Sequence, residues 1–337
     1  MILVTGGTGF IGSHLLYNLI QAGEKVRVLT RNKKNNQFTK KIFRYYSNDD
    51  DGGFSKLEWI EGDILDIFSL QEAMQNVDHV YHCAALVSFH PSDKKSLNKI
   101  NIEGTANVIN TALDCKVQKL CYISSIAALG REDNIFVIDE ETTWKKSRKN
   151  SMYAISKYGA EREVWRGSVE GLNTIIVNPS VVLGPSENYK ANSEIFYTVW
   201  NGLRFYTKGI NGFVDVRDVA KVMIALMNSE IVNERFIVSS ENFSYQNVFN
   251  EIAKFLGKKQ PNIYVNPFFG EFAWRLEKAR SFITNKKPFI TKETARTAGQ
   301  TNRYSNEKIC KTLNYNFISI QQSIHDMCHY FIKEMDS

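Results

Sequence analysis

Cysteine is scarce in this chain, and long hydrophobic runs are absent from it. The five cysteines among 337 residues include no Cys-x-x-Cys pair, which argues against a disulfide framework and a cysteine-based zinc site. No apolar run reaches the roughly 20 residues that cross a bilayer, and no signal peptide precedes the first apolar segment. We therefore expect a cytoplasmic protein without stable membrane insertion.

The chain also lacks a large excess of charge of either sign. Lys and Arg number 42 against 36 Asp and Glu, which leaves a net charge of +6. This small excess mildly favours anionic small ligands and gives no reason to expect nucleic acid as a partner. The composition, 43% hydrophobic and 23% charged, is typical of a globular protein. We expect no metal site, because the only helically spaced histidine pair, His325 and His329, is typical of surface histidines.

Glycines are concentrated just after the first apolar run. Residues 1–5 are expected to form a buried strand, and a helix is expected to follow Gly-Gly-Thr-Gly-Phe-Ile-Gly at 6–12. The spacing fits a dinucleotide fingerprint, in which glycines permit a tight turn, a close pyrophosphate and close helix packing. The helix N-terminus then offers N–H groups to phosphates. The predicted cofactor contacts here are Gly6, Gly9, Phe10, Ile11 and Gly12.

Strands and helices alternate through the first half of the chain. Strands are predicted at 1–5, 25–30, 57–61, 79–83, 119–124 and 173–178, and helices near 9–22, 69–74, 95–115 and 151–170. Such alternation is typical of a parallel sheet covered on both faces. The predicted fold class is α/β, a Rossmann-type doubly wound parallel sheet with a smaller, mostly helical C-terminal substrate lobe.

The predicted domain boundary follows residue 178. Residues 1–178 form the NADP-binding Rossmann domain and 179–337 the substrate lobe, except that about 210–230 return to the sheet as a strand entering a helix. Residues 31–56 interrupt the alternation with basic, then acidic, then glycine residues. We interpret this stretch as a solvated insertion, with a lid or a disordered loop as the alternative.

A second motif adds chemistry to the expected cofactor site. Tyr153 and Lys157 lie four residues apart on a predicted helix and therefore share one face. A Lys ammonium beside a phenol stabilises the phenolate and lowers a pKa that is ordinarily about 10. A tyrosine tuned in this way can exchange a proton near neutral pH.

Together with the glycine turn and with Ser124 and Ser125 at the end of a strand, this pair resembles the extended short-chain dehydrogenase/reductase superfamily. The closest likeness is to its dihydroflavonol-reductase and hydroxysteroid-dehydrogenase-like members. The resemblance implies further cofactor contacts after successive strands, with a supporting asparagine on the next helix. These residues are Asp63, Ile64, Ala84, Ala85, Asn101, Lys157 and Pro179.

The resemblance also implies the roles of the catalytic residues. Tyr153 would be the general acid/base, Lys157 would bind the ribose hydroxyls and lower the pKa of Tyr153, and a serine would hold the substrate oxygen. Ser125 is preferred for that serine because it lies five residues before Gly130, and Ser124 is the alternative. Asn178 departs from the arginine that the family usually has there, which leaves the local hydrogen bonding open.

The end of the second predicted strand bears on the choice of cofactor. An NAD enzyme usually has an acidic residue here, whereas this chain has Thr30, Arg31 and Asn32. Arg31 can bind a 2′-phosphate with two parallel hydrogen bonds and stack on adenine. The predicted cofactor is therefore NADP, with NAD as the alternative.

Three classes of function fit these motifs. The first is an NADP-dependent reductase of a ketone or aldehyde, the second an NAD(P)-dependent nucleotide-sugar epimerase or dehydratase, and the third a non-catalytic cofactor sensor. The Tyr153 and Lys157 pair disfavours the third, and Arg31 disfavours the second. The resemblance also implies a homodimer joined through helices near 95–115 and 151–170. An apolar stripe over 268–283 is expected to pack into the small lobe, with a membrane surface as the alternative.

Overall fold

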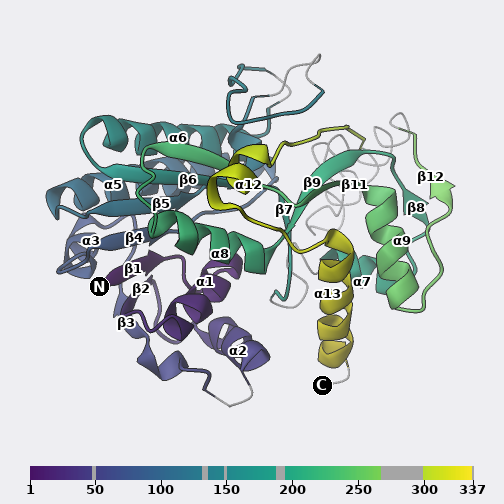
Figure 1. Cartoon of the computed structure of the whole chain (residues 1–337), viewed down its shortest axis with the longest axis horizontal. Helices are drawn as coiled ribbons and strands as arrows, with labels where there is room; N and C mark the ends of the chain where they lie inside the picture. Colours follow the sequence, from purple (N-terminus) through teal and green to yellow (C-terminus); the bar gives the residue numbers. More distant parts are fainter. Residues whose placement is uncertain (48–50, 131–135, 148–149, 187–193, 267–298, 336–337) are drawn as a thin grey trace.

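A seven-stranded parallel sheet forms the centre of the protein (Figure 1). The computed structural model describes residues 1–47, 51–130, 136–147, 150–186, 194–266 and 299–335. The strand order is β3-β2-β1-β4-β5-β6-β10, which reverses direction between β1 and β4 as in a doubly wound Rossmann sheet. The strands are β1 (Ile2–Thr5), β2 (Val26–Thr30), β3 (Glu58–Glu61), β4 (His79–His82), β5 (Lys119–Ile123), β6 (Asn173–Pro179) and β10 (Glu234–Val238).

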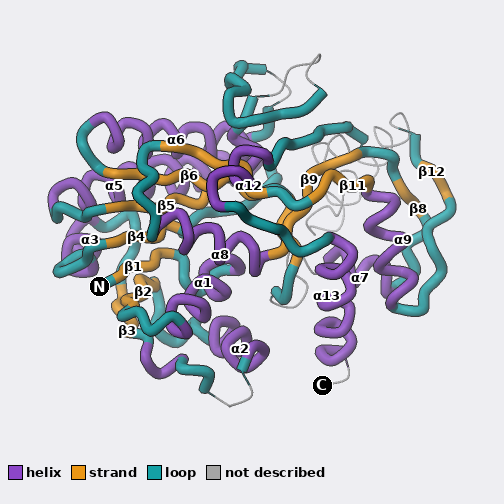
Figure 2. Tube along the Cα trace, viewed as in Figure 1, coloured by secondary structure: helices purple, strands orange, loops and turns teal. Residues whose placement is uncertain are grey.

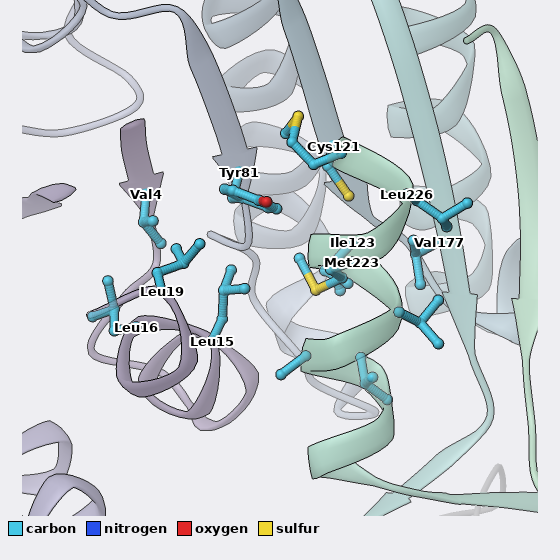
Figure 3. Packing of buried hydrophobic residues seen from close by; sticks show 14 of the residues in the cluster. Val4, Leu15, Leu16, Leu19, Tyr81, Cys121, Ile123, Val177, Met223 and Leu226 are labelled. Atoms are coloured by element: carbon cyan, nitrogen blue, oxygen red, sulfur yellow. The ribbon is translucent and has the colours of Figure 1, made fainter. Parts of the chain in front are cut away.

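Helices cover both faces of this sheet because both faces of its central strands are apolar. Val4 of β1 packs in one cluster and its neighbour Leu3 in another, since successive side chains of a strand point to opposite faces. Figure 3 shows Val4 beside Leu15 and Leu19 of the first helix. One face is covered by α1 (Phe10–Gln21), α2 (Gln37–Tyr46) and α8 (Val216–Met227), and the other by α3 (Ile67–Ala73), α5 (Gly104–Asp114) and α6 (Met152–Val169).

The short helix α4 (Lys94–Leu97) runs through a π-helical turn at Asn98–Glu103 directly into α5. The predicted helix near 95–115 is therefore present, with this irregular turn in its first half.

The stretch 31–56 contains a helix, and its interpretation as an insertion without structure is wrong. Helix α2 occupies 37–46, and a single 3₁₀ turn (Phe54–Lys56) precedes β3. Ile42 and Phe43 are fully buried, and Phe43 packs edge-on against Tyr17 of α1. Lys33 and Lys34 are exposed before α2, and Lys40 is exposed on it, which is why the composition resembles a solvated loop.

The C-terminal part builds a second, smaller core beside the main sheet (Figure 2). Its three-stranded sheet has the order β11-β9-β7, and a two-stranded ribbon pairs β8 with β12. The strands are β7 (Val181–Leu183), β8 (Phe205–Tyr206), β9 (Ile210–Asp215), β11 (Glu241–Ser244) and β12 (Ile263–Tyr264), and the helices are α7 (Glu194–Trp200), α9 (Tyr245–Phe255) and α13 (Ile320–Met335). Helix α12 (Glu307–Leu313) instead packs Ile309 into the main core, beside β10. Apolar residues of α7, α9, α13, β7 and β9 meet in this core.

The segment expected to return to the main sheet divides between the two cores. Its helix, α8, does cover the main sheet, whereas its strand, β9, pairs with β7 and β11 in the small sheet. The strand that returns is β10, which pairs in parallel with β6 and was not predicted. The turn before β10 is fastened by Asn233, whose side-chain oxygen accepts from the Thr174 amide at 3.0 Å.

None of the helices in the described part of the chain combines the length and the apolar character needed to cross a bilayer. The apolar stripe over 268–283 lies outside the described residues, so its predicted packing is not addressed by the structure.

Candidate active site

The glycine turn between β1 and α1 brings the backbone too close for side chains. Gly6 has φ +70°, and a Cβ there would lie 2.5 Å from the backbone nitrogen of Ala84. A Cβ at Gly12 would lie 2.2 Å from the carbonyl oxygen of Gly6. Gly9 is the N-cap of α1 and offers no side-chain cap, so the first-turn N–H groups are left to a ligand. This bare helix N-terminus fits the pyrophosphate of a dinucleotide.

The other predicted cofactor residues follow the carboxyl ends of parallel strands. Arg31 directly follows β2 and is exposed, and Asp63 follows β3 and accepts from the Leu65 amide at 3.0 Å. Ala84 and Ala85 come soon after β4, and Pro179 ends β6. Because parallel strands all end at one edge of a sheet, these residues lie along the carboxyl edge of the main sheet. The strand order reverses at this edge between β1 and β4.

Asn101 and Ile64 occupy supporting positions. The buried Asn101 amide accepts from the Leu86 amide at 2.7 Å and donates to the Leu86 carbonyl at 3.0 Å and to Ser156 Oγ at 2.9 Å. Asn101 therefore ties the loop after β4 to helix α6, next to Tyr153. Ile64 packs on Gly104, where a Cβ would lie 2.6 Å from its Cδ1.

Tyr153 lies in the first turn of α6, which begins where the Ser151 side chain accepts from the Ala154 amide at 2.8 Å. Its side chain is largely buried, with 9% of the residue exposed. Burial raises the pKa of Tyr153 to about 12, and a hydrogen bond with Ser125 opposes this rise. The phenol is therefore protonated at neutral pH in the ligand-free protein, and Ser125 is its immediate partner.

Lys157 is buried one helical turn further along α6, with 2% of the residue exposed. Its Nζ donates to the Tyr122 hydroxyl at 3.1 Å and to the Ile123 carbonyl at 2.8 Å. Burial lowers the pKa of Lys157 to about 8, and the negative charge of Glu161 opposes the fall. Tyr122, which sequence reasoning missed, thus fixes the ammonium from strand β5. A tyrosine in a buried strand carries no signal of this role.

The two neighbouring serines face different partners. Ser125 caps a 3₁₀ turn (Ile126–Ala128), accepting from the Ala127 amide at 3.1 Å, and it hydrogen-bonds Tyr153. Ser124 instead lies toward Glu161, a buried carboxylate that sequence reasoning also missed; its hydroxyl lowers the pKa of Glu161, although its Oγ forms no hydrogen bond of ordinary geometry. The structure therefore brings Ser125, Tyr153 and Lys157 together, with Ser124 on the far side.

An aromatic ring lies beside the catalytic phenol. Phe89, from the loop after β4, meets Tyr153 edge-on, with ring centroids 5.5 Å apart and an interplanar angle of 70°. Phe89 is 41% exposed, and nearby Val87 is also exposed. We call these two residues the apolar patch. A substrate that reaches the Tyr153 hydroxyl from this side would meet hydrocarbon surface.

No group of three metal-ligating side chains occurs among the residues that the structure describes. His325 and His329 are in contact on α13, with their Nε2 atoms 3.0 Å apart. Two ligands alone do not complete a structural metal site.

A family model for the NAD-dependent epimerase/dehydratase family matches residues 2–238. That stretch runs from β1 to the end of β10 and includes the glycine turn, Ser125 and the Tyr153 and Lys157 pair. The chain belongs to the NAD-dependent epimerase/dehydratase family. It is therefore an NAD(P)-dependent enzyme of the extended short-chain dehydrogenase/reductase type, as its motifs predicted.

Curated relatives include several reductases. The chain is 28% identical to a putative dihydroflavonol 4-reductase from Synechocystis, over 97% of this chain and 93% of the relative. It is 28% identical to cinnamoyl-CoA reductase 1 from Petunia hybrida, over 76% of this chain and 77% of the relative. The predicted likeness to dihydroflavonol reductases is confirmed.

Solved structures confirm the predicted fold class. The crystal structure of gox2253 matches with a TM-score of 0.79 and 27% identity, covering 99% of this chain and 98% of that one. A UDP-glucose 4-epimerase from Thermotoga maritima matches with a TM-score of 0.76 and 20% identity, covering 99% of both chains. At this identity the epimerase shows the shared fold alone.

Proposed function

We propose that this enzyme reduces a ketone or aldehyde of a small organic substrate, using NADP as the cofactor. The observation that carries the proposal is the contact of Tyr153, the partner of Ser125, with the exposed ring of Phe89, two residues after exposed Val87 in the same loop. An apolar surface beside the proton donor suits a hydrocarbon-bearing carbonyl compound better than a polyhydroxylated sugar. The reductase names of the relatives support the same choice.

The three side chains divide the chemistry of the reduction. The bound nicotinamide would supply a hydride to the carbonyl carbon. Tyr153 then donates its phenolic proton to the carbonyl oxygen, so that the product is an alcohol. Ser125 donates a hydrogen bond to the same oxygen as negative charge develops on it. Lys157 binds the ribose hydroxyls and stabilises the phenolate that Tyr153 becomes.

The cofactor preference rests on Arg31. Its exposed guanidinium stands at the carboxyl end of β2, where an acidic residue would repel a 2′-phosphate. A planar guanidinium can form two charge-assisted hydrogen bonds to that phosphate. These bonds have no counterpart with NAD.

The purified protein should be incubated with NADPH and, separately, with aldehydes, ketones and nucleotide sugars. The proposal expects loss of nicotinamide absorbance with at least one carbonyl compound. Interconversion of a nucleotide sugar without net loss of absorbance would contradict the proposal, because an epimerase regenerates its cofactor.

We further propose a cytoplasmic homodimer joined through α5 and α6. Several apolar residues of these two helices are committed to the protomer's own core, since Val108, Ile109, Ala160 and Val164 are fully buried. Outward-facing Met152 and Ile155 of α6 remain available. Light scattering at micromolar concentration should give twice the chain mass, and the monomer mass would contradict the proposal.

A further inference from the structure

A carboxylate is buried behind the catalytic residues. Glu161 lies four residues after Lys157 and eight after Tyr153 on α6, a spacing that puts all three on one helix face. Only 1% of Glu161 is exposed. Glu163, two residues further, points elsewhere and forms an ordinary surface ion pair with Arg166 at 2.9 Å. The burial of Glu161 is therefore a property of its face and not of α6 in general.

Asn178 connects this carboxylate to the catalytic serine. Its Nδ2 donates to Glu161 Oε1 at 2.5 Å and to the backbone carbonyl of Ser125 at 2.9 Å. Asn178 is the residue that departs from the family's usual arginine, and the structure shows what it does instead. Asn178 links the Glu161 carboxylate to the backbone of Ser125 through these two hydrogen bonds.

The positive charge that an arginine at position 178 would supply comes instead from a different strand, β10. Arg235 of β10 approaches Glu161, with Nη1 3.7 Å from Oε2. The same guanidinium donates through Nε to the Glu140 carbonyl at 2.8 Å, in the segment that leads toward α6. Glu140 in turn accepts from the Ile237 amide of β10 at 2.8 Å. Arg235 is thus held in place from both sides.

A buried carboxylate is costly unless cations and hydrogen-bond donors surround it. Burial raises the pKa of Glu161, and the hydrogen bond from Asn178, the nearby Ser124 hydroxyl and the charges of Arg235 and Lys157 oppose the rise. The polar groups around Glu161 and Lys157 come from several packed elements, namely His82 of β4 and Cys83 directly after it, Tyr122 and Ser124 of β5 and its end, Tyr153 of α6, Asn178 of β6 and Arg235 of β10.

Of these groups, only Glu161 can give Lys157 a negative counter-charge at neutral pH. Tyr122 and the Ile123 carbonyl bind the ammonium as neutral acceptors, and burial keeps the pKa of Cys83 near 12. The charge of Glu161 raises the pKa of Lys157, against the larger effect of burial.

We propose that Glu161, paired with Arg235, is a positioning residue of the active site. It holds the Ser125 backbone through Asn178 and supplies the negative charge that keeps buried Lys157 positively charged. This inference rests on the proposed function, because it assigns Glu161 to the same catalytic group. An ion pair that only stabilised the fold would change the melting temperature without moving any pH profile.

The test compares Glu161→Gln with Glu163→Gln on the same helix. The glutamine at 161 keeps the size and an oxygen for Asn178, and it removes the charge. Because a neighbouring opposite charge commonly shifts a pKa by about 1–3 units, the alkaline fall of kcat should move about one pH unit lower in Glu161→Gln. Glu163→Gln should keep the wild-type profile. Glu161→Asp should return the profile toward the wild-type pH, at a lower maximal rate because the shorter chain reaches Asn178 less well.

A folded Glu161→Gln variant with the wild-type pH profile would overturn the proposal. If that variant does not fold, Asn178→Ala removes the hydrogen bonds to Glu161 and to the Ser125 carbonyl without touching α6. It should lower kcat with NADPH affinity nearly intact, and an unchanged kcat would overturn the proposal.

NADPH affinity measured against pH by nicotinamide fluorescence separates this inference from the proposed function. Affinity should weaken at lower pH in Glu161→Gln than in the wild type, because uncharged Lys157 binds the ribose less well. This titration needs no carbonyl substrate. If no carbonyl compound is reduced, the proposed function fails while the binding profile still decides the role of Glu161.

Discussion

The main sheet and the small lobe of this enzyme are specified in different ways. At the edge of the main sheet, backbone geometry requires particular residues, as at Gly6 and Gly12, where any side chain would collide with backbone. The small lobe is held by a core of interchangeable apolar side chains from α7, α9, α13 and its three-stranded sheet. Many apolar combinations of similar volume fill such a core.

Because of this difference, the sequence indicates much more about the function of the main sheet than about that of the small lobe. In the first region, a few residues whose identity is constrained by geometry indicate the cofactor and the proposed chemistry. The second, which we propose to shape the space for a substrate, is built from side chains that carry no recognisable motif. Changes in the first region should therefore affect cofactor binding and turnover, whereas changes along the substrate's path should mainly affect KM.

The largest expected effect comes from Tyr153→Phe. The change keeps the buried ring and its contact with Phe89 while removing the proton donor. Turnover should fall about 10²–10⁴-fold, with NADPH affinity nearly intact. Steady-state kinetics and a fluorescence titration provide the two measurements. Wild-type turnover in a variant that binds NADPH normally would remove Tyr153 from the mechanism.

The second prediction compares buried and exposed histidines. Burial lowers the pKa of His14 to about 4 and that of His82 to about 3, whereas each takes up a proton near pH 6.5 in the unfolded chain. The unfolded state thus binds more protons below pH 6.5, and the free energy of unfolding should fall as pH drops from 6.5 toward 4. Full titration of His14 would cost ~3 kcal/mol.

Urea unfolding at several pH values measures this loss. His82→Asn should flatten the pH dependence, although the variant loses the 2.7 Å contact with Thr5 and is less stable at pH 7. His329→Asn, in the exposed pair on α13, should leave the slope unchanged. Equal slopes in all three proteins would contradict the assignment.

The third prediction concerns Arg31→Ala. Loss of one or two charge-assisted hydrogen bonds, at about 1.5–3 kcal/mol each, should weaken NADP(H) binding roughly tenfold or more. NAD(H) binding should change little, because NAD(H) has no 2′-phosphate. If the wild type binds NADH as tightly as NADPH, Arg31 does not determine the cofactor.

The smallest expected effect is that of Phe89→Leu. Leucine keeps an apolar surface beside Tyr153 and removes the aromatic edge, so KM should rise about three- to tenfold while kcat changes little. Phe68→Leu, at an exposed ring on α3, is the matched control and should leave both constants unchanged. A three- to tenfold fall of kcat in Phe89→Leu, in place of the rise of KM, would show that Phe89 orients Tyr153 instead of binding substrate.

The residues at the carboxyl edge of the main sheet were predicted well from the sequence, because local geometry constrains the identity of each of them separately. The Gly6–Gly12 spacing and the Tyr153 and Lys157 pair each identify a backbone conformation or a shared helix face. The predicted strands β1 to β6 all exist, and so do the four helices predicted in the first half, near 9–22, 69–74, 95–115 and 151–170.

The features that the sequence did not reveal depend on contacts between distant segments. The stretch that contains helix α2 is basic, then acidic, then glycine-rich, so its composition suggested a loop, whereas buried residues such as Phe43 hold the helix in place. Strand β10 joins the sheet only because β6 offers it an edge. Glu161 and Arg235 are ordinary charged residues whose pairing across 74 positions is visible only in the fold.

Hydride transfer to a substrate carbon is the central claim, and isotope transfer tests it most directly. Cofactor deuterated at the reactive C4 position should be incubated with a carbonyl compound that the enzyme reduces, and the product analysed by mass spectrometry. One deuterium per molecule of alcohol, bound to the former carbonyl carbon, is the predicted result. A product without deuterium, or a nucleotide sugar inverted with no net cofactor consumption, would contradict the account.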